Sequence, residues 1–302
     1  MNWLTRGVGA MEIEIQELYV TYKPLLFSLA YRMLGSVMDA EDMVQDIFIA
    51  IDKVDTTKVT NVKAFLCKMV TNRCIDYLRS ARSKREVYVG PWLPEPILTG
   101  EGGTDPAIAA LVRDDLSIAY LTMMEHLTET ERAVLVLREA LGFDYPEIAE
   151  MVGKSEANCR KILSRVKKKL GNQAEDQTTS VAQHAQLIQD FLQAITDGDV
   201  KRVLTLLTTD AVLYSDGGGI VKAALNPIIT GERVAAFLTG VAKKRTAAYT
   251  YQFVEVNGRP GFVGYSDGQI HSVWVFELRD GRIDQIYAVL NPEKLRHIRQ
   301  SS

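Results

Sequence analysis

The sequence predicts a multidomain protein in which two all-α domains, the second with a helix-turn-helix, are followed by an α+β domain. Three observations predict this order. Apolar residues recur at helical spacing in residues 12–54, 61–85 and 128–170. Within 128–170, two short helices are joined by a tight turn that contains glycine, as in a helix-turn-helix. After residue 249, alternating runs are separated by Asn-Gly and Asp-Gly dipeptides, which are strong hairpin signals.

Composition bounds the class of protein. The 302 residues suffice for two or three domains, and the apolar content of 47% supports real hydrophobic cores. A net charge of −3 does not by itself indicate a nucleic-acid binder, but the positive charge is concentrated locally, so the global value misleads. Because no long apolar run is present, we expect no signal peptide, no membrane partner and a cytoplasmic location.

The three cysteines lack metal-ligand spacing. An odd number of cysteines in a chain of this length favours a reducing compartment. Cys67 and Cys74 lie two turns apart on one predicted helix, so we interpret them as buried small hydrophobic residues. The sequence therefore predicts no metal site, and we also expect no cofactor and no catalytic residue.

Residues 12–54 predict two helices. The first carries an apolar stripe and ends at Gly35. The second places Asp39, Asp42 and Asp46 on one face, where like charges lower the stability of a helix. A basic partner protein explains this face, and plain solubility is the alternative that the residues leave open.

Asn61–Arg85 predicts a third helix with a polar, partly basic strip. Its end, from Arg79 to Arg85, contains four positive charges and no negative one. A basic helix end suits contacts with DNA phosphates. A solvated terminus, with cations near the negative end of the helix dipole, is the alternative.

A linker is predicted to follow this helix. The residues between Glu86 and Arg113 include no Lys or Arg and four of the nine prolines. Such a segment is expected to be extended where proline is frequent and loose at its glycines. Trp92 is unusual in a linker, because a large apolar ring usually finds a surface that covers it.

The helix-turn-helix has clear local signals. Thr128 and Glu131 match a capping box, and Pro146 suits a first helical turn. Gly153 can take the left-handed conformation that ends a helix. Ser155 then caps the last helix.

That last helix is the predicted DNA reader. From Lys154 to Lys169 there are seven Lys or Arg against one Glu, while Cys159 and its helical neighbours face inward. Such a helix can enter a major groove with its N-terminal residues at base edges. Charge alone favours a solvated helix in a bundle, whereas the caps, the turn and the one-sided charge together favour DNA binding. A response-regulator effector domain uses the same parts.

These motifs resemble, in the right order, those of bacterial sigma-70-type factors of the extracytoplasmic-function class. Asp39–Phe48 resembles the signature helix of that class. Ala64–Arg79 resembles its promoter −10 reading helix, and Thr128–Leu170 resembles its −35 reading domain. The resemblance covers residues 12–171 and implies core RNA polymerase, through its β′ clamp, and promoter DNA as partners.

The resemblance also implies the contact residues. Core polymerase would bind Asp39, Glu41, Asp42, Gln45 and Asp46. The −10 element would be contacted by Asn61, Lys63, Asn72, Arg73, Asp76 and Arg79. The −35 element would be contacted by Glu156, Asn158, Arg160, Lys161, Ser164 and Arg165. The family often has Thr-Val at the positions of Asn158 and Cys159, so the −35 sequence does not follow from these residues.

A different domain is predicted after a second polar linker. Three helices, the last at Gly231–Lys244, and a short strand at Ala211–Ser215 precede a curved antiparallel meander, which gives an α+β layer. The strands of the meander are expected at Tyr249–Val256, Phe262–Ser266, Gln269–Arg279 and Arg282–Leu290. The predicted domain boundaries are 12–86 for sigma-2, 87–112 for the first linker, 113–171 for sigma-4, 172–180 for the second linker and 181–302 for the last domain.

This last domain resembles the SnoaL-like branch of the NTF2-like cone fold. With Trp92–Pro96, Asp216–Gly219 and Asn291–Leu295, it resembles the sigma-J-like subgroup, in which a fused SnoaL-like domain modulates activity in cis, with no separate anti-sigma protein required. The second motif usually ends in Lys, but Ile220 stands there and Lys222 follows two residues later. The implied regulatory contacts are Trp92, Leu93, Pro94, Asp216, Gly217, Gly218, Gly219, Asn291, Pro292 and Lys294.

A cone fold often holds a pocket, and this leaves further functions open. Candidate lining residues are Asp216, Tyr249, Tyr265, His271 and Trp274. General acid–base catalysis needs a titratable group held against a substrate, and neither paired carboxylates nor a close His–Asp spacing is present. A small-molecule ligand in this pocket stays open, as do a one-component DNA-binding sensor and a SnoaL-type enzyme fused to a transcription-control module. The acidic signature helix favours the sigma factor.

Overall fold

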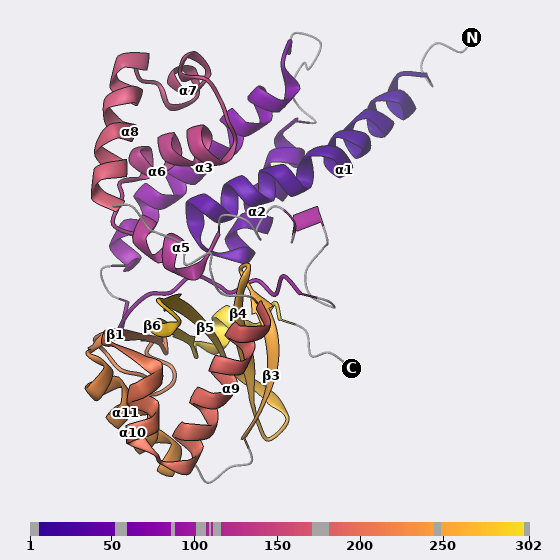
Figure 1. Cartoon of the computed structure of the whole chain (residues 1–302). Coiled ribbons are helices and arrows are strands. Elements are labelled where there is room, and N and C mark those ends of the chain that lie inside the picture. Colours follow the sequence, from indigo (N-terminus) through magenta and orange to yellow (C-terminus); the bar gives the residue numbers. More distant parts are fainter. Residues whose placement is uncertain are drawn as a thin grey trace. The chain divides into compact units, whose positions relative to one another are not determined.

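A computed structural model describes residues 6–51, 59–85, 88–100, 107–108, 110, 116–170, 181–244 and 249–298. The chain divides into two compact units, and Figure 1 labels their elements. Unit 1 combines residues 1–83 with 124–171, and unit 2 combines 84–123 with 172–302. The second predicted linker at 172–180, the glycines at 102–103 of the first linker and the side chains of the basic helix end at 82–85 lie outside the described residues.

The elements described in unit 1 are helices, as predicted. They are α1 (Arg6–Leu34), α2 (Val37–Ile51), α3 (Val62–Arg85), α6 (Glu129–Leu135), the π-helix η2 (Val136–Ala140), α7 (Tyr145–Val152) and α8 (Glu156–Leu170). The first helix ends where Gly35 takes a φ of +67°, a conformation that glycine adopts without strain. At the start of α3, the Asn61 side chain accepts the Ala64 N–H at 3.1 Å.

A buried arginine joins the two halves of unit 1. Arg132 in α6 is 3% exposed, and it donates to the Met33 carbonyl of α1 at 2.6 Å and to the Met124 carbonyl at 2.8 Å. Its guanidinium also pairs with Glu125 at 2.9 Å. Because a buried charge is tolerated only when it is paired and hydrogen-bonded, this side chain fixes α6 against the end of α1.

The cysteines are buried small residues, as predicted. Cys67, Cys74 and Cys159 are free thiols without exposed surface. Burial raises the pKa of Cys67 to about 12, because the charged thiolate is disfavoured away from water. These cysteines therefore help to fill the hydrophobic core on the buried sides of α3 and α8.

Unit 2 contains a six-stranded sheet of order β2-β1-β6-β5-β4-β3. Its strands are β1 (Leu207–Asp216), β2 (Ile228–Ile229), β3 (Tyr249–Val256), β4 (Arg259–Ser266), β5 (Gln269–Arg279) and β6 (Arg282–Val289). Its helices are α5 (Ile118–Met124), which ends at the boundary with unit 1, α9 (Val181–Asp197), α10 (Val200–Leu206), α11 (Gly231–Lys243) and the 3₁₀-helix η3 (Pro292–Leu295). The predicted fold class, helical domains followed by an α+β domain, is confirmed.

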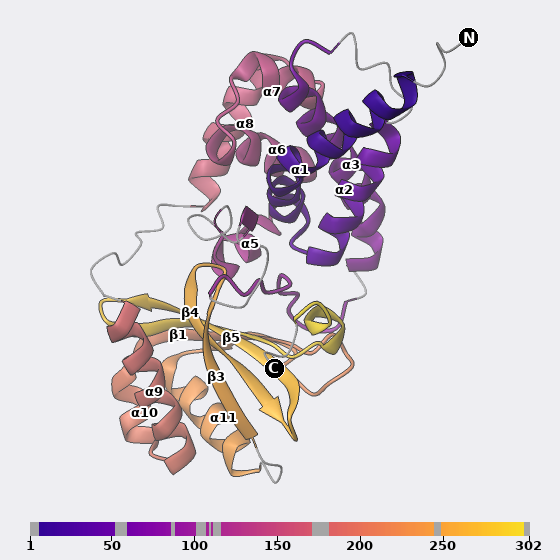
Figure 2. The same ribbon diagram turned by 90° about the vertical axis from the view of Figure 1, so that its right-hand side faces the viewer.

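Both faces of this sheet are covered. Helices α9, α10 and α11 lie on one face (Figures 1 and 2) and enclose a core that includes Phe191, Leu213 and Phe276. On the other face, Leu93 of the linker and Ile118 of α5 join a second core of sheet residues. A strand points alternate side chains to opposite faces, so each strand serves both cores.

Three features of the sheet differ from the prediction. β4 begins at Arg259 rather than at Phe262. β1 runs from Leu207 to Asp216 rather than from Ala211 to Ser215, and β6 pairs with it in parallel at Leu207 and again from Val212 to Asp216. The two-residue strand β2 adds to the other side of β1 and was not predicted. The β3–β6 meander is antiparallel as expected, and both residues of the Asn257-Gly258 turn have positive φ, as type I′ hairpins require.

None of the helices in the described ranges combines the length and the apolar character that crossing a bilayer requires.

Candidate functional sites

The predicted polymerase-binding residues lie on one helix. Glu41, Asp42, Gln45 and Asp46 are exposed on α2, whose opposite side is buried against the core. Asp39 is half-buried in the first turn of α2, where its N–H bonds to the Ser36 hydroxyl at 3.1 Å.

Two apolar side chains flank this acidic face. Met38 is 46% exposed and Ile49 is 63% exposed, and the sequence did not single out either. A surface that combines negative charge with exposed apolar area suits a protein partner with a basic rim.

The predicted −10 residues share the exposed side of α3. Asn72, Arg73, Asp76 and Arg79 are exposed, while Cys74 and Ile75 between them are buried. The four are therefore available on one helix surface for contacts with DNA.

Several of these side chains already have partners within unit 1. Arg73 pairs with Asp46 of α2 at 3.1 Å, and Arg79 pairs with Glu129 of α6 at 3.0 Å. The Lys63 ammonium lies 5.2 Å from the centroid of the Phe143 ring. Ion pairs with this exposure contribute little stability, so these side chains can exchange partners at small cost.

The helix-turn-helix forms as the sequence predicts. Thr128 and Glu131 make a reciprocal capping box, and Gly153 ends α7 with a φ of +63°. The Ser155 hydroxyl accepts the Asn158 N–H at 3.3 Å. A second capping box, from Asp144 to Glu147, was not predicted.

Packing of α7 also departs from the expected face. Helical spacing predicts an apolar face of Ile148, Ala149 and Val152. In the structure Ile148 and Met151 are buried, whereas Ala149 and Val152 are only half-buried. The long, flexible Met side chain reaches further into the core than Ala149 can.

The predicted −35 residues gather on the outer face of α8. Arg160, Lys161, Ser164 and Arg165 line an open depression in the surface, and Cys159 faces the core. This depression presents three cations and a hydroxyl, which are groups that bind phosphates and base edges.

The Arg160 side chain is held in place before any DNA binds. Its guanidinium carbon lies 4.2 Å from the centroid of the Tyr145 ring, and its Nη2 lies 3.3 Å from Glu156. Both Glu156 and Arg160 are exposed, and Asn158 is half-buried. Stacking on a ring fixes the plane of an arginine, which favours bidentate recognition of a base.

In unit 2 a buried ion pair ties the first linker to the sheet. Asp216, at the end of β1, is 0% exposed, and its Oδ2 lies 2.7 Å from Lys294 Nζ. The same oxygen accepts the Leu93 N–H at 2.9 Å, and Oδ1 accepts the Tyr88 hydroxyl at 2.5 Å. Lys294 Nζ also donates to the Leu93 carbonyl. We call these four residues, Asp216, Lys294, Tyr88 and Leu93, the linker clamp.

Aromatic rings of the linker surround the ammonium group of the clamp. Lys294 Nζ lies 4.0 Å from the centroid of Trp92 and 5.0 Å from that of Tyr88, so the rings contribute cation–π attraction. Leu93 and Pro94 are buried next to them. Burial, and then the hydrogen bond to Asp216, raises the pKa of Tyr88, so the phenol stays a proton donor.

Lys294 is positioned by the Asn291–Leu295 motif, which follows β6. Asn291 caps η3 by accepting the Glu293 N–H at 3.0 Å, and its amide donates to the Tyr88 hydroxyl at 3.0 Å. Pro292 occupies the first turn of η3, where its missing N–H costs nothing. The motif thus holds the linker through both Asn291 and Lys294.

The glycines after Asp216 are required by close approach. A Cβ at Gly217 would lie 2.3 Å from the Val221 carbonyl oxygen. A Cβ at Gly218, which has a φ of +60°, would lie 2.2 Å from Asn291 Nδ2. Gly219 follows with a φ of +73°. Only glycine fits the first two positions, which keep Asn291 against Asp216.

The departure from the family motif at Ile220 does not leave Asp216 without a cation. Ile220 is 55% exposed, and Lys222 lines a cavity on the helix-covered face of the sheet. Lys294 supplies the positive charge instead.

Two candidate pocket residues were assigned to the wrong face. His271, Tyr249 and Trp274 line the cavity of unit 2 as expected, but Asp216 and Tyr265 do not. Asp216 binds the linker, and Tyr265 packs in the core on the linker side. The alternation of side chains along β1 and β4 accounts for the error.

A second anchor of the linker was not predicted at all. The Asn257 side chain accepts the Ile97 N–H at 2.9 Å and donates to the Leu116 carbonyl at 2.9 Å. Thr99 extends the pairing through its N–H to the Glu255 carbonyl at 2.9 Å. In the sequence, Asn257 and its following glycine indicated only a turn.

Comparisons with known proteins agree with this architecture. Residues 18–84 match the family Sigma-70 region 2, and residues 117–170 match Sigma-70, region 4. The ECF RNA polymerase sigma factor SigJ of Mycobacterium tuberculosis is 31% identical over 280 residues, which cover 89% of each chain. The probable ECF RNA polymerase sigma factor SigI of the same species is 25% identical over 92% of this chain and 93% of that one. The crystal structure of M. tuberculosis SigJ matches with a TM-score of 0.75 and 28% identity, covering 93% of this chain and 98% of that chain.

Two sigma-70 regions in this order, the second with a helix-turn-helix, define a transcription initiation factor that works with RNA polymerase. The chain belongs to the extracytoplasmic-function sigma factors, and it directs promoter-specific transcription initiation. It is therefore a transcription factor, and its similarity to SigJ includes the α+β unit.

The linker clamp yields a prediction about stability. Lys294→Met leaves Asp216 buried and unpaired, and Asp216→Asn leaves Lys294 unpaired, so each should lower the free energy of unfolding of unit 2 by about 3–5 kcal/mol. The double variant should lose less than the sum of the two, because neither charge then lacks a partner. Urea unfolding followed by circular dichroism measures these values.

Arg296→Met is the matched control for the clamp variants. Arg296 pairs with Glu293 at 3.5 Å, with both side chains largely exposed, so the change should cost less than about 1 kcal/mol. Additive losses in the double variant, or equal losses for Lys294 and Arg296, would contradict the clamp.

Proposed function

We propose that α2 is the surface by which this sigma factor binds core RNA polymerase, through the β′ clamp. The observation that carries the proposal is the exposed face of Glu41, Asp42, Gln45 and Asp46 next to Met38. Charge repulsion within one helix is unfavourable in the free protein. A basic partner surface relieves it, and the exposed apolar side chains add contact area.

Charge reversal tests this surface. Asp42→Arg should weaken binding to core polymerase about tenfold and make the remaining binding less dependent on salt, because an exposed charge at the rim steers association. The side chain is exposed, so the fold should be unaffected. A titration of labelled protein against core enzyme at two salt concentrations gives the result.

Glu232→Arg is the control, since Glu232 is an exposed acid in the first turn of α11. It should bind core enzyme as the unchanged protein does. Equal affinity of the Asp42 and Glu232 variants would reject the assignment of α2.

We further propose that α3 contacts the −10 element and α8 contacts the −35 element. Support comes from the surface depression lined by Arg160, Lys161, Ser164 and Arg165. The stacked guanidinium of Arg160 is the best candidate for a base contact. For α3, Asn72, Arg73, Asp76 and Arg79 present the exposed polar surface, and Asn61 and Lys63 lie at its start.

Replacing Arg160 separates base reading from phosphate binding. Arg160→Ala should reduce run-off transcription from the cognate promoter about tenfold or more, since a base contact carries about 1–3 kcal/mol of discrimination. It should change transcription from a template with a scrambled −35 element much less. Lys168→Ala, an exposed cation of α8 outside the depression, should weaken both templates slightly and alike. Equal activity of the Arg160 variant and the unchanged protein on the cognate template would refute the assignment.

Finally, we propose that unit 2 regulates the sigma domains in cis, with no separate anti-sigma protein required. The segment that the clamp and Asn257 hold connects α3, which ends at Arg85, with α6, which begins at Glu129. A fixed linker limits the separations that the two DNA-reading domains can reach. Within one chain the effective concentration is roughly millimolar, so even a modest contact is well populated.

The regulatory proposal leads to a comparison of truncations. Ending the chain at Leu290 removes Asn291 and Lys294, so it should free the linker and raise transcription. Ending it at Leu170 also removes any productive spacing that unit 2 sets, and should give less transcription than the Leu290 truncation. Run-off transcription at matched concentration and salt compares them with the full chain. Equal activity of all three would eliminate regulation in cis.

A SnoaL-type enzyme finds little support as a second function. The cavity of unit 2 is lined by His271 and Tyr249 but by no Asp or Glu. Acid–base catalysis at neutral pH usually requires a carboxylate beside such a histidine. A one-component sensor has no use for the acidic face of α2, and the family comparison favours the sigma factor.

A further inference from the structure

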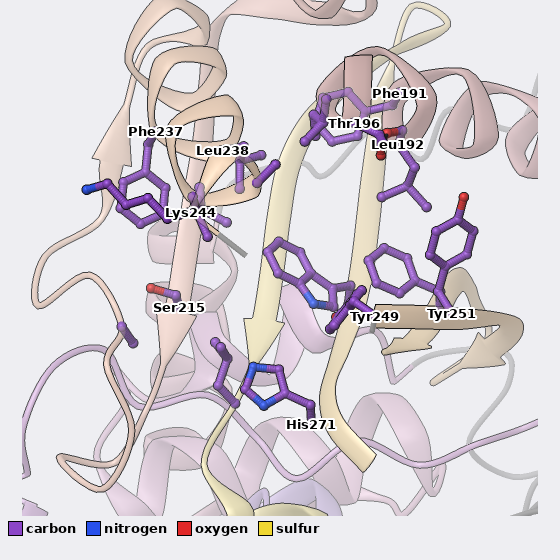
Figure 3. A pocket seen from close by; sticks show the side chains of 18 of the residues that line it. Phe191, Leu192, Thr196, Ser215, Phe237, Leu238, Lys244, Tyr249, Tyr251 and His271 are labelled. Atoms are coloured by element: carbon purple, nitrogen blue, oxygen red, sulfur yellow. Dashed lines mark hydrogen bonds between the residues drawn. The ribbon is translucent and has the colours of Figure 1, made fainter. Parts of the chain in front are cut away.

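Unit 2 holds a cavity of about 540 Å³ between its helices and the curved sheet (Figure 3). Figure 3 shows Phe191 and Thr196 from α9, Phe237 and Leu238 from α11, and Tyr249 from β3 around it. Sites for small organic ligands fall in the range of about 300–1,000 Å³. The linker clamp lies on the other face of the sheet, so this cavity is a separate site.

The walls of the cavity are mainly aromatic and aliphatic. Phe262 and Trp274 are stacked, with centroids 5.6 Å apart and ring planes inclined by 14°. Phe191 and Phe276 meet edge to face at 6.0 Å. Leu213 and Leu238 complete the apolar lining. Such a surface binds an apolar body, and the parallel rings favour a flat one.

The polar groups of these walls are largely satisfied by the protein. Ser272 accepts the Trp274 indole N–H at 2.8 Å and lies 2.8 Å from the Tyr249 hydroxyl. The Ser215 hydroxyl accepts the Ala224 N–H at 2.9 Å, and the Thr196 hydroxyl donates to the Leu192 carbonyl at 2.9 Å. A ligand therefore meets few neutral hydrogen-bonding groups that need a partner.

The specificity for a ligand comes from charge rather than from the neutral polar groups of the walls. Two lysines, Lys222 and Lys244, line the cavity, and no Asp or Glu does. Both lysines are exposed, and neither makes an ion pair with a residue that the structure describes. Cations at the edge of an apolar cavity favour a ligand with one negatively charged group.

We propose that this cavity binds a small apolar monocarboxylate. The hydrocarbon or aromatic body lies among Phe191, Phe262 and Trp274, and the carboxylate pairs with Lys222 and Lys244. Lys222 lies in the segment that follows the Asp216–Gly219 turn, and it brings a cation to the cavity.

The cavity and the linker clamp share two strand ends. Ser215 lines the cavity and the next residue, Asp216, holds the linker. Leu290 lines the cavity and the next residue, Asn291, binds Tyr88. A ligand that moves these strand ends changes both sides of the sheet. The binding site stands without this connection, and its test needs no polymerase.

Isothermal titration of the full chain tests the proposal with 2-naphthoate and decanoate as probes and 2-naphthamide as the uncharged analogue. We expect at least one carboxylate to bind with a stoichiometry of one, and the amide to bind at least tenfold more weakly. Lys222→Gln combined with Lys244→Gln should weaken the carboxylate about tenfold and leave the amide unchanged. Lys243→Gln, an exposed neighbour outside the cavity, should change neither.

Two variants that fill the cavity complete the test. Thr196→Trp and Ala242→Phe each place a larger side chain at the lining, and either one, with an unchanged melting temperature, should abolish binding of both probe types. No saturable binding of either carboxylate overturns the proposal. So does equal binding of carboxylate and amide, or binding that persists in a folded variant with a filled cavity.

Discussion

The arrangement of unit 2 depends on one buried ion pair. Asp216 and Lys294 are 78 positions apart in the chain, and their charges meet at 2.7 Å away from water. Two desolvated charges are stable only when further hydrogen bonds complete their shells. Here the linker provides them, through the Leu93 N–H and carbonyl and the Tyr88 hydroxyl. The linker is therefore needed to complete the hydrogen bonds of this ion pair. Without the linker, Asp216 and Lys294 would lack some of their hydrogen-bond partners.

Successive side chains of a β-strand point to opposite faces, so the two faces of this sheet present different residues. Leu213 and Ser215 of β1 face the helices and the cavity, whereas Asp216 faces the linker. The parallel pairing of β1 with β6 aligns Asp216 with Val289, which brings Asn291 and Lys294 beside it. This register also places Leu290 at the cavity. The same pairing thus positions both the linker clamp and the proposed ligand site.

Local features of the fold were predictable because their causes are local. The Thr128–Glu131 capping box, the helix end at Gly153 and the Asn257-Gly258 turn follow from residues within a few positions of one another. Contacts between distant segments were not predictable in the same way. The parallel β1–β6 pairing and the role of Arg132 have no pattern in the sequence. Pairing of distant strands is decided by tertiary packing rather than by propensity.

The same distinction between local features and distant contacts applies to the candidate sites. Resemblance to a family singled out the motif residues, but not the chemistry that joins them. The resemblance placed Asp216, Leu93 and Lys294 among the regulatory contacts, but Asp216 was also a candidate pocket residue, because nothing within a few positions of it shows that Lys294 and Leu93 will surround it. Tyr88 was missed for the same reason. On α8 the spacing alone placed Arg160 and Lys161 on one outer face, since a helix fixes that geometry by itself.

The contacts within the two units differ in strength, and this difference bears on how the protein can change. Arg73–Asp46 and Arg79–Glu129 involve largely exposed arginines, so each contributes at most about 1 kcal/mol. Loss of these ion pairs would therefore leave the fold of unit 1 largely unchanged. The clamp is buried. Opening it would leave a buried charge without its partner, and this costs several times more free energy than the loss of an exposed ion pair. Among the described ion pairs, those of Arg73 and Arg79 lie on the exposed side of α3, whereas Asp216–Lys294 in unit 2 and Arg132–Glu125 in unit 1 are largely buried. Under the proposal that unit 2 regulates in cis, opening the clamp would free the linker without changing the exposed groups of α3 and α8.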